Sequence, residues 1–409
     1  MAYNNRSSSI SSLSDTTVTT SATTSTSATT TITSSDSGLG LSLSHNNSPD
    51  QPLHRNPSQR NPSQHVSKVK IDNFEEIYAK KCPGMIYIPT ILPAVSRIVV
   101  FGDIHGDYSV LLKMLKISKV ADDALKWTGK NTHVIQIGDQ IDSYRKGRLT
   151  RDNPELVKND TGDDIKIMEL CNTLHAQAIK EGGMFISLLG NHELMNNQGD
   201  MRYVSHKNIE IFKGKNGIAD GLASRTHSFA PGNEIATMMG CTRMACIIIG
   251  EHLFVHAGII NELIDELGIT KATDLESINM AVQLWLLGLL KDKESDYINK
   301  ILNAKNSMFW ARILGEIDSG LSLSNPKCKD CISKVLTTLK IGNMVIGHTP
   351  QSMRNRNSNS TCDNRIWRID NGSSYAFNSM GDIPTRLVQV LEITHDHHTK
   401  KDTFTVLDK

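Results

Sequence analysis

Three apolar segments of this 409-residue chain each end in a turn that begins with glycine and carries acidic, amide or imidazole side chains. Each segment is typical of a buried strand. Polar residues at the carboxyl ends of strands are the usual position of active sites in open α/β sheets, which predicts an α/β fold with a functional site at that edge. The three turns are Gly102-Asp103-Ile104-His105-Gly106-Asp107, Gly138-Asp139-Gln140-Ile141-Asp142-Ser143 and Gly190-Asn191-His192-Glu193.

The rest of the folded part predicts further strands and the helices between them. Apolar residues at helical spacing over 109–118 and 165–180 predict β-α-β units, and 143–164 predicts a long loop beside the site. A hairpin over 244–255 would present His256, and a strand over 344–346 would present His348. The pattern predicts a four-layer α/β fold, with two packed mixed β-sheets flanked by helices. We expect the other strands at 86–89, 97–101, 132–137, 184–189, 365–369 and 386–392, and helix over 278–314.

Residues 1–66 differ in composition from the rest. They are dominated by serine and threonine, contain hardly an aromatic residue and end in a tandem repeat over 55–64. Such a segment buries too little apolar area to offset its ordering entropy, so we predict a disordered tail over 1–66 and one folded domain over 67–409. A featureless extension is the simpler interpretation; a regulatory tail with phosphorylation or docking sites is the alternative.

Charge, hydropathy and cysteine usage limit the possible partners and compartments. With 44 basic and 43 acidic residues, the net charge of +1 predicts neither nucleic-acid nor membrane binding. No secretory signal is visible, and the longest apolar run, 280–290, is shorter than the ~20 residues that span a bilayer. The odd number of scattered cysteines, seven, predicts reduced thiols in an intracellular, cytoplasmic protein. For the lone CxxC motif, Cys328 to Cys331, we favour an ordinary loop over half a zinc site or a redox pair.

Six donor side chains at strand ends form a candidate metal site. Taken singly, each has an ordinary explanation, since an aspartate after a strand can cap a helix. Five glycine-flanked turns that each deliver oxygen or imidazole donors together favour two divalent ions such as Mn, Fe or Zn. The candidate ligands are Asp103, His105, Asp139, Asn191, His256 and His348.

These turns resemble the motifs of the calcineurin-like metallophosphoesterases, specifically their phosphoprotein phosphatase branch. The GDxHG, GNHE and HAG motifs of that branch begin unchanged at Gly102, Gly190 and His256. The resemblance covers roughly 93–392 and is nearest to the Shewanella-like phosphatases. The segments that resemble this group's longer motifs are Gly190 to Val204, Gly347-His348-Thr349-Pro350-Gln351 and Ile369-Asp370-Asn371-Gly372.

The resemblance implies a role for each candidate residue. It implies that a first metal is held by Asp103, His105 and Asp139, and a second by Asp139, Asn191, His256 and His348. Ions about 3.5–4 Å apart share a water whose pKa falls, so that hydroxide attacks phosphorus and no protein nucleophile is needed. It also implies that His192 protonates the leaving oxygen while Asp142 orients its ring.

The resemblance fails at one position of the GDxxDRG motif. The family places an arginine after the second aspartate of this motif, and this chain has Ser143 there. Arginine suits phosphate because it donates two parallel hydrogen bonds. Three arginines are candidates to replace it: Arg312, in a Trp-x-Arg element that resembles the group's own, then Arg145, then Arg202.

We therefore expect a metal-dependent hydrolase of phosphoric monoesters that acts on phosphorylated proteins or peptides. The protein substrate rests on the resemblance alone, and the preference among phosphoserine, phosphothreonine and phosphotyrosine stays open, as does the oligomeric state. One alternative is a dinucleoside polyphosphate hydrolase, which uses nearly the same ligands. The other is a catalytically weak binding module that keeps the fold and recruits partners through its tail.

Overall fold

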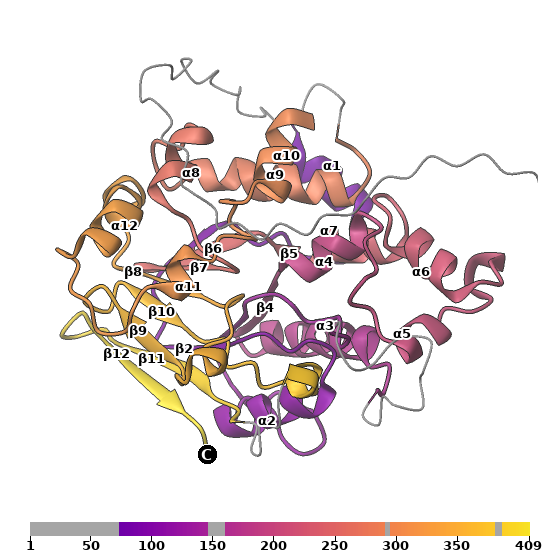
Figure 1. The fold of residues 1–409 in the computed structure, drawn as a ribbon, viewed down its shortest axis with the longest axis horizontal. Helices are drawn as coiled ribbons and strands as arrows, with labels where there is room; N and C mark the ends of the chain where they lie inside the picture. Colours follow the sequence, from indigo (N-terminus) through magenta and orange to yellow (C-terminus); the bar gives the residue numbers. More distant parts are fainter. Residues whose placement is uncertain (1–72, 146–159, 291–294, 381–386) are drawn as a thin grey trace, which may run out of the picture. The chain divides into compact units, whose positions relative to one another are not determined.

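A computed structural model describes residues 73–145, 160–290, 295–380 and 387–409. The predicted tail over 1–66 and most of the predicted loop over 143–164 lie outside these ranges. The described strands form two six-stranded sheets with helices around them (Figure 1). The predicted class, two packed mixed sheets flanked by helices, is confirmed.

The first sheet carries the three turns that dominate the sequence. Its strands β2, β3, β4 and β5 run parallel, and β11 and β12 add an antiparallel hairpin beside β2. The order is β12-β11-β2-β3-β4-β5, so the first two turns follow neighbouring strands as predicted. The bounds are β2 (Arg97–Phe101), β3 (His133–Gln136), β4 (Met184–Leu188), β5 (Arg243–Met244), β11 (Val390–Asp396) and β12 (Lys401–Leu407).

The second sheet carries the two remaining histidine turns. Its order is β1-β6-β7-β8-β10-β9, with antiparallel pairs β6–β7 and β9–β10 and parallel pairs elsewhere. The predicted hairpin is therefore confirmed as β6 and β7, but its first strand starts later than predicted, because Met244 belongs to β5 of the first sheet. The bounds are β1 (Ile91–Leu92), β6 (Cys246–Ile249), β7 (His252–Val255), β8 (Asn343–Ile346), β9 (Asn359–Thr361) and β10 (Ile366–Arg368).

Helices cover the outer face of each sheet (Figure 1). Figure 1 shows α2 and α3 on the side of the first sheet, and α8, α9 and α10 on the opposite side. The bounds are α1 (Phe74–Lys81), α2 (Tyr108–Ser118), α3 (Asp164–Lys180), α4 (Asn191–Asn197), α5 (His206–Glu210), α6 (Gly221–Phe229), α7 (Glu234–Thr242), α8 (Asn261–Glu266), α9 (Asp274–Leu286), α10 (Ser295–Asn303), α11 (Ile313–Glu316) and α12 (Pro326–Leu339). Short 3₁₀ turns occupy Lys215–Gly217, Ser352–Arg354 and Tyr375–Met380.

The side chains of each strand point alternately to the two faces of its sheet, and this alternation forms the apolar layers of the core. In β2, Ile98 and Val100 face the second sheet, and Val99 and Phe101 pack against α2 and α3. Because successive side chains of a strand point to opposite faces, a strand covered on both faces is apolar throughout. The first sheet is thus packed on both faces, which fixes the turns at the carboxyl ends of its strands.

Three predicted elements differ from the structure. The segment 86–89 is no strand; its chain is irregular, and Pro89, which lacks an N–H to donate, precedes the short strand β1. The helical region 278–314 is broken, since α9 ends at Leu286 ahead of Gly288, whose φ of 67° ends a helix readily. The strand predicted over 386–392 begins at Val390 and continues to Asp396, because β12, which we did not predict, pairs along it.

The cysteines also differ from the prediction. Four of the seven form two disulfides, Cys82–Cys241 and Cys328–Cys362, so the prediction of reduced thiols is wrong for these. Their Cα atoms lie 5.4 and 5.6 Å apart although 159 and 34 positions separate them in sequence, a proximity that no spacing reveals. The cytoplasmic prediction, which rested on reduced thiols, loses this support. Within the described ranges, no helix is both long enough and apolar enough to cross a membrane.

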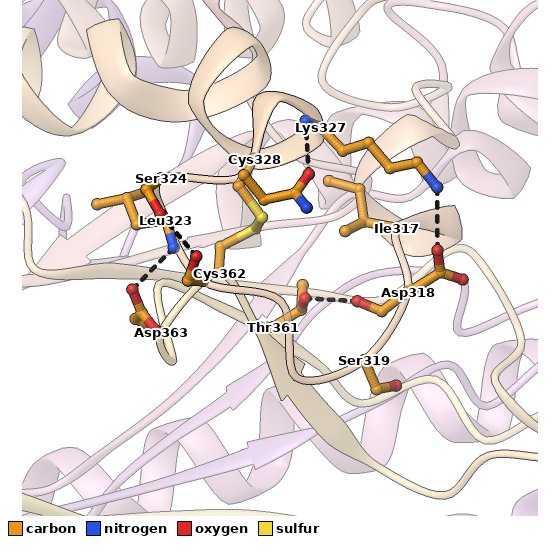
Figure 2. The surroundings of a disulfide bond; sticks show 12 residues. Ile317, Asp318, Ser319, Leu323, Ser324, Lys327, Cys328, Thr361, Cys362 and Asp363 are labelled. Carbon is orange, nitrogen blue, oxygen red and sulfur yellow. Dashed lines mark hydrogen bonds and ion pairs between the residues drawn. A yellow bond between two sulfur atoms is a disulfide. The ribbon is translucent and has the colours of Figure 1, made fainter.

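The CxxC motif lies in a helix and not in a loop. Asn325 accepts a hydrogen bond from Lys327 N and caps α12, which Pro326 begins. Figure 2 shows Cys328 bonded to Cys362, which ties α12 to the turn between β9 and β10. Beside the bond, the hydroxyl of Thr361 donates to the Asp318 carbonyl at 2.6 Å. Cys328 is therefore unavailable for the zinc site or the Cys328–Cys331 redox pair.

Replacing Cys328 and Cys362 together by serine is expected to lower the free energy of unfolding by about 3–4 kcal/mol. The disulfide closes a loop of 34 positions, and removing it restores conformational entropy to the unfolded chain. Urea denaturation measures the change. Cys331→Ser is the matched control, expected to stay within about 0.5 kcal/mol, because this thiol is partly exposed and unbonded. Equal stability of the double variant and the control would contradict the prediction.

Candidate metal centre

The six predicted ligands converge at the carboxyl ends of strands from both sheets. Asp103 and His105 follow β2, Asp139 follows β3 and Asn191 begins α4 directly after β4. His256 and His348 follow β7 and β8 of the second sheet. All six side chains are buried. Packing of the two sheets thus brings together residues that span more than half of the chain.

Four residues at this centre have a strained backbone conformation. His105, Asp139, Asp142 and His348 have φ values of 46°, 51°, 74° and 64°, in the left-handed region that residues with a Cβ rarely adopt. Such conformations cost about 1–3 kcal/mol each, and they persist where the surrounding structure imposes them, typically at functional sites. These conformations therefore lower the stability of the fold, and they direct the side chains toward the centre.

Two glycines allow the turns to approach each other. A Cβ on Gly190 would lie 2.1 Å from Asp139 Oδ1, and one on Gly347 would lie 2.3 Å from Asp103 Oδ1. Any side chain at either position would displace a candidate ligand. The glycines in the sequence motifs are thus required by the close contact between turns.

Asp139 lies at the middle of the cluster. Its Oδ2 is 3.4 Å from His256 Nε2, 3.7 Å from His105 Nε2 and 4.0 Å from His192 Nε2. Two sets of ligand atoms meet the spacing for a metal, one from His105, Asp139 and His192, the other from Asp139, His256 and His348. Asp139 belongs to both, as expected of a bridging carboxylate.

The hydrogen bonds of the histidines fit a metal centre. His256 Nδ1 donates to the Ile137 carbonyl at 2.8 Å, so its Nε2 presents a lone pair, 3.1 Å from Asn191 Oδ1. That oxygen and Asp139 Oδ2 are also lone-pair donors, so either a proton on His256 Nε2 or a metal cation has to lie between these atoms. His348 Nε2 is buried and has no hydrogen-bond partner in the described structure. A divalent ion would satisfy all these atoms.

The electrostatics point the same way. Burial raises the pKa of Asp103 well above its usual range, and the neighbouring carboxylates of Asp370 and Asp139 add to the effect. Burial also raises the pKa of Asp370 to about 6. Burial alone would raise the pKa of Asp139 too, but His256 and His192 outweigh it and lower this pKa. The concentrated negative charge is what divalent cations would offset.

His192 and Asp142 form a buried pair beside the cluster. Asp142 Oδ2 lies 2.9 Å from His192 Nδ1, and Asn196 Nδ2 donates to both oxygens of the same carboxylate at 3.1 and 3.0 Å. Arg225 Nε donates to Asn196 Oδ1 at 3.0 Å and Arg225 Nη2 to Asp164 Oδ2 at 2.8 Å. The orientation of His192 thus depends on a chain of fully buried polar groups.

A cavity of about 270 Å³ opens over the cluster. Arg145 and Arg312 both line it. Arg145 Nη2 lies 2.9 Å from His105 Nδ1, and Arg312 Nη1 donates to the His348 carbonyl at 3.1 Å. Arg202 does not line the cavity; its side chain is 67% exposed and pairs with Asp200 at 2.6 Å. The structure therefore brings two of the three candidate arginines to the centre.

Sequence reasoning assigned no role to four residues of this region. Tyr203 and Phe377 line the cavity, and the Arg145 guanidinium lies 5.3 and 4.8 Å from their ring centres. Glu193 accepts hydrogen bonds from the backbone N–H groups of Asp139, Gln140 and Gly190 at 2.7–2.9 Å, which locks two turns together. Asp370 adds buried charge. Glu193, Tyr203 and Asp370 lie inside the quoted motifs, so their positions were visible but their contacts were not.

Comparisons with known proteins agree with this description. The family model described as calcineurin-like phosphoesterase matches residues 96–352. Shewanella-like protein phosphatase 2 of Arabidopsis thaliana is 28% identical, over 73% of this chain and 75% of its own length. An uncharacterized protein, R398, of Acanthamoeba polyphaga mimivirus is 39% identical, over 55% of this chain and 94% of its own length.

The fold recurs in a solved structure titled as a cold-active protein tyrosine phosphatase. The superposition has a TM-score of 0.56 at 20% identity and covers 84% of this chain and 87% of that one. The predicted resemblance, including the Shewanella-like group, is confirmed. Family membership implies a hydrolase with divalent metal ions. This chain belongs to the calcineurin-like phosphoesterase family.

Proposed function

We propose that this chain is a metal-dependent phosphoprotein phosphatase. The observation that carries the proposal is the cluster of six candidate metal ligands that includes Asp139, with an oriented histidine and two arginines around the same cavity. This combination provides every group that phosphomonoester hydrolysis needs: metal ligands, a proton donor and cations for the phosphate oxygens.

The ligands divide into two sets that share Asp139. Asp103, His105 and Asp139 would hold one ion, and Asp139, Asn191, His256 and His348 the other. Bound there, the ions would supply charge neutralisation and an acidified water able to attack phosphorus. Within the chain, the Ile137 carbonyl keeps His256 oriented. His348 N donates to Asp103 Oδ2 at 3.1 Å, which links the second set of ligands to the first.

His192 would protonate the leaving oxygen. An alkoxide is a poor leaving group, so a proton delivered as the P–O bond breaks lowers the barrier. Asp142 Oδ2 accepts a hydrogen bond from Nδ1, which leaves Nε2 directed to the cavity. The backbone N–H of His192 donates to Asp139 Oδ1 at 3.0 Å, so the ring is tied to the metal ligands as well.

Arg145 and Arg312 would bind the phosphate oxygens. Ser143 leaves the family's usual position without a cation, and Arg145, two residues later, has its guanidinium in the cavity wall. Its Nη1 donates to the carbonyls of Asp142 and Tyr144, both at 2.8 Å, which anchors the side chain next to the catalytic pair. The clamp would thus be supplied by the same turn from a shifted position.

The protein substrate is supported by the names of relatives, a Shewanella-like protein phosphatase and a protein tyrosine phosphatase. The test compares kcat/KM of the manganese-loaded protein on phosphoserine, phosphothreonine and phosphotyrosine peptides with that on diadenosine tetraphosphate. Faster turnover of the peptides supports the proposal. Preference for the dinucleotide would overturn the protein substrate, and no turnover of any substrate would favour the binding module.

Arg145→Ala is expected to lower kcat/KM on a phosphopeptide roughly tenfold or more. The variant loses charge-assisted hydrogen bonds to the phosphate, which are stronger than neutral ones. Arg202→Ala is the matched control, because this exposed arginine lies outside the cavity lining, and a change under about twofold is expected. An unaltered rate in Arg145→Ala, or an equal loss in both variants, would contradict the assignment.

Asn196→Ala is expected to lower kcat on a phosphoserine peptide roughly tenfold and to affect p-nitrophenyl phosphate less. The variant removes two hydrogen bonds that hold Asp142, so the orientation of His192 loosens, and only a poor leaving group needs its proton. Asn197→Ala controls for a new cavity, since the amide of Asn197 bonds to the Phe229 carbonyl instead. Equal losses on the two substrates would argue against a positioning role.

A further inference from the structure

Two aromatic rings contact Arg145 in the wall of the cavity over the metal centre. The Arg145 Cζ atom lies 5.3 Å from the ring centre of Tyr203 and 4.8 Å from that of Phe377. A guanidinium within about 6 Å of an aromatic ring centre is attracted to the ring, whose face is negative. The three residues come from separate segments, since Arg145 follows the turn after β3, Tyr203 follows α4 and Phe377 lies in the 3₁₀ turn Tyr375–Met380. We call Tyr203 and Phe377 the aromatic frame.

The hydrogen bonds of Arg145 leave its positive charge available to a substrate. Nη1 donates to the carbonyls of Asp142 and Tyr144, and Nη2 lies 2.9 Å from His105 Nδ1. None of these three acceptors is a carboxylate oxygen. Neutral groups and ring faces thus hold the guanidinium in the wall, and none of them competes as an anion with a phosphate group.

Phe377 is fixed beside the centre by the residues just before it. The hydroxyl of Ser374 donates to the His105 carbonyl at 3.1 Å, and Tyr375 N donates to Asp107 Oδ2 at 2.9 Å. These two bonds attach the segment to the first of the three glycine turns. The Phe377 ring is 5% exposed, and its centre lies 5.3 Å from that of the His105 ring. Its position is therefore set by the turn that carries two candidate metal ligands.

Tyr203 is tied to the segment that carries Arg145. Tyr144 N, one residue before Arg145, donates to the Tyr203 carbonyl at 3.0 Å. The centre of the Tyr203 ring lies 4.9 Å from that of the His192 ring. Both members of the aromatic frame thus contact Arg145 and also a histidine of the candidate centre.

We propose that Tyr203 and Phe377 are positioning residues that direct Arg145 at the phosphate group of the substrate, an inference that rests on the proposed function. The family's arginine directly follows the second aspartate of its motif, whereas Arg145 comes two residues after Ser143 and reaches the cavity by a different path. A flexible arginine loses conformational entropy when it binds an anion. Rings that restrict the guanidinium beforehand reduce this loss.

The test is a double-mutant cycle on the full-length, manganese-loaded protein, which measures the Kd of orthophosphate and kcat/KM on a phosphoserine peptide. Phe377→Leu keeps an apolar side chain but removes the ring face, so we expect about fivefold weaker binding and about fivefold lower kcat/KM. Phe377→Tyr retains the ring face and should stay within about twofold of the wild type. In the Arg145→Ala background, Phe377→Leu should add less than about twofold, because the side chain that it positions is absent. Equal losses in the two backgrounds would overturn the proposal.

Further readouts distinguish action through Arg145 from action through the neighbouring histidines. Phe377→Leu should keep the wild-type metal content; loss of metal would show that the ring acts through His105 and would overturn its role. Tyr203→Leu should lower kcat/KM by the same factor on the phosphoserine peptide and on p-nitrophenyl phosphate, because a phosphate clamp serves both substrates. A loss confined to the peptide would show that Tyr203 acts through His192 and would overturn its role.

Orthophosphate binding requires no turnover, so it separates this inference from the proposed function. A wild type that hydrolyses phosphopeptides while the cycle is additive would refute the positioning role alone. A wild type without turnover would refute the proposed function, and coupling between Phe377 and Arg145 in orthophosphate binding would still support the positioning role. Phe404→Leu is the matched control, because this ring stacks on Trp367 away from the cavity lining, and it should change neither quantity.

Discussion

Asp139→Asn is expected to reduce kcat/KM by at least about 10³-fold and to abolish stable binding of both metal ions. The substitution keeps the size of the side chain but removes the negative charge that both ligand sets share. It also places an amide N–H₂ group, a donor without a lone pair, where His256 and His105 approach within 3.4 and 3.7 Å.

Two measurements and a control variant check this expectation. Elemental analysis should find close to two divalent ions per wild-type chain and far fewer in the variant. Chelation should lower the melting temperature of the wild type, because a ligand bound only by the folded state stabilises it, and should leave the variant nearly unchanged. Asp265→Asn, the same chemical change at an exposed ion pair with Lys334, is the control and should retain metal and activity. A variant that keeps both ions would refute the bridge.

His192→Ala is expected to lower kcat on a phosphoserine peptide by about 10²–10⁴-fold. The same variant should lose far less, within roughly tenfold, on p-nitrophenyl phosphate, because nitrophenolate leaves without a proton. Asp142→Asn should show the same dependence on the leaving group with a smaller loss, since the ring remains but its tautomer and orientation are no longer held.

This comparison also separates two roles that the geometry permits for His192. Its Nε2 lies near Asp139 and His105, so it meets the spacing of a metal ligand as well as that of a proton donor. Loss of a metal ligand would reduce the metal content and lower kcat equally on both substrates. Loss of a proton donor would leave the metal content intact and largely preserve kcat on p-nitrophenyl phosphate, which has the good leaving group. His398→Ala, an exposed histidine on the hairpin of β11 and β12, should change neither quantity.

Much of the first sheet could be predicted because its signals are local. Strands β2, β3 and β4 are each a short apolar run that ends at a glycine turn. Helices α2 and α3 each have apolar residues at helical spacing. Elements that depend on distant partners were missed or misplaced. Strand β12 is amphipathic and half exposed, and it exists because β11 pairs along its whole length.

The cysteines illustrate the same limit. Their number and spacing predicted free thiols, but the approach of α12 to the turn after β9 brings Cys328 to Cys362 (Figure 2). Likewise, the sequence does not predict which arginine reaches the cavity. Arg202 lies in a quoted motif, and Arg145 does not match one. Only the path of the chain after Asp142 directs Arg145 into the cavity and leaves Arg202 exposed at its own ion pair.

The sequence by itself determined the chemistry at the turn from Gly138 to Ser143 and at the turns that resemble it. Residue types and their attachment to strand ends are local properties, so the donors Asp103, Asp139 and His256 could be named without coordinates. Only the tertiary structure decided how these donors meet. The packing of the two sheets brings Asp139 next to His256. Buried hydrogen bonds from Asn196 and Arg225 fix the orientation of His192. Long-range packing sets such distances, and no sequence spacing encodes them.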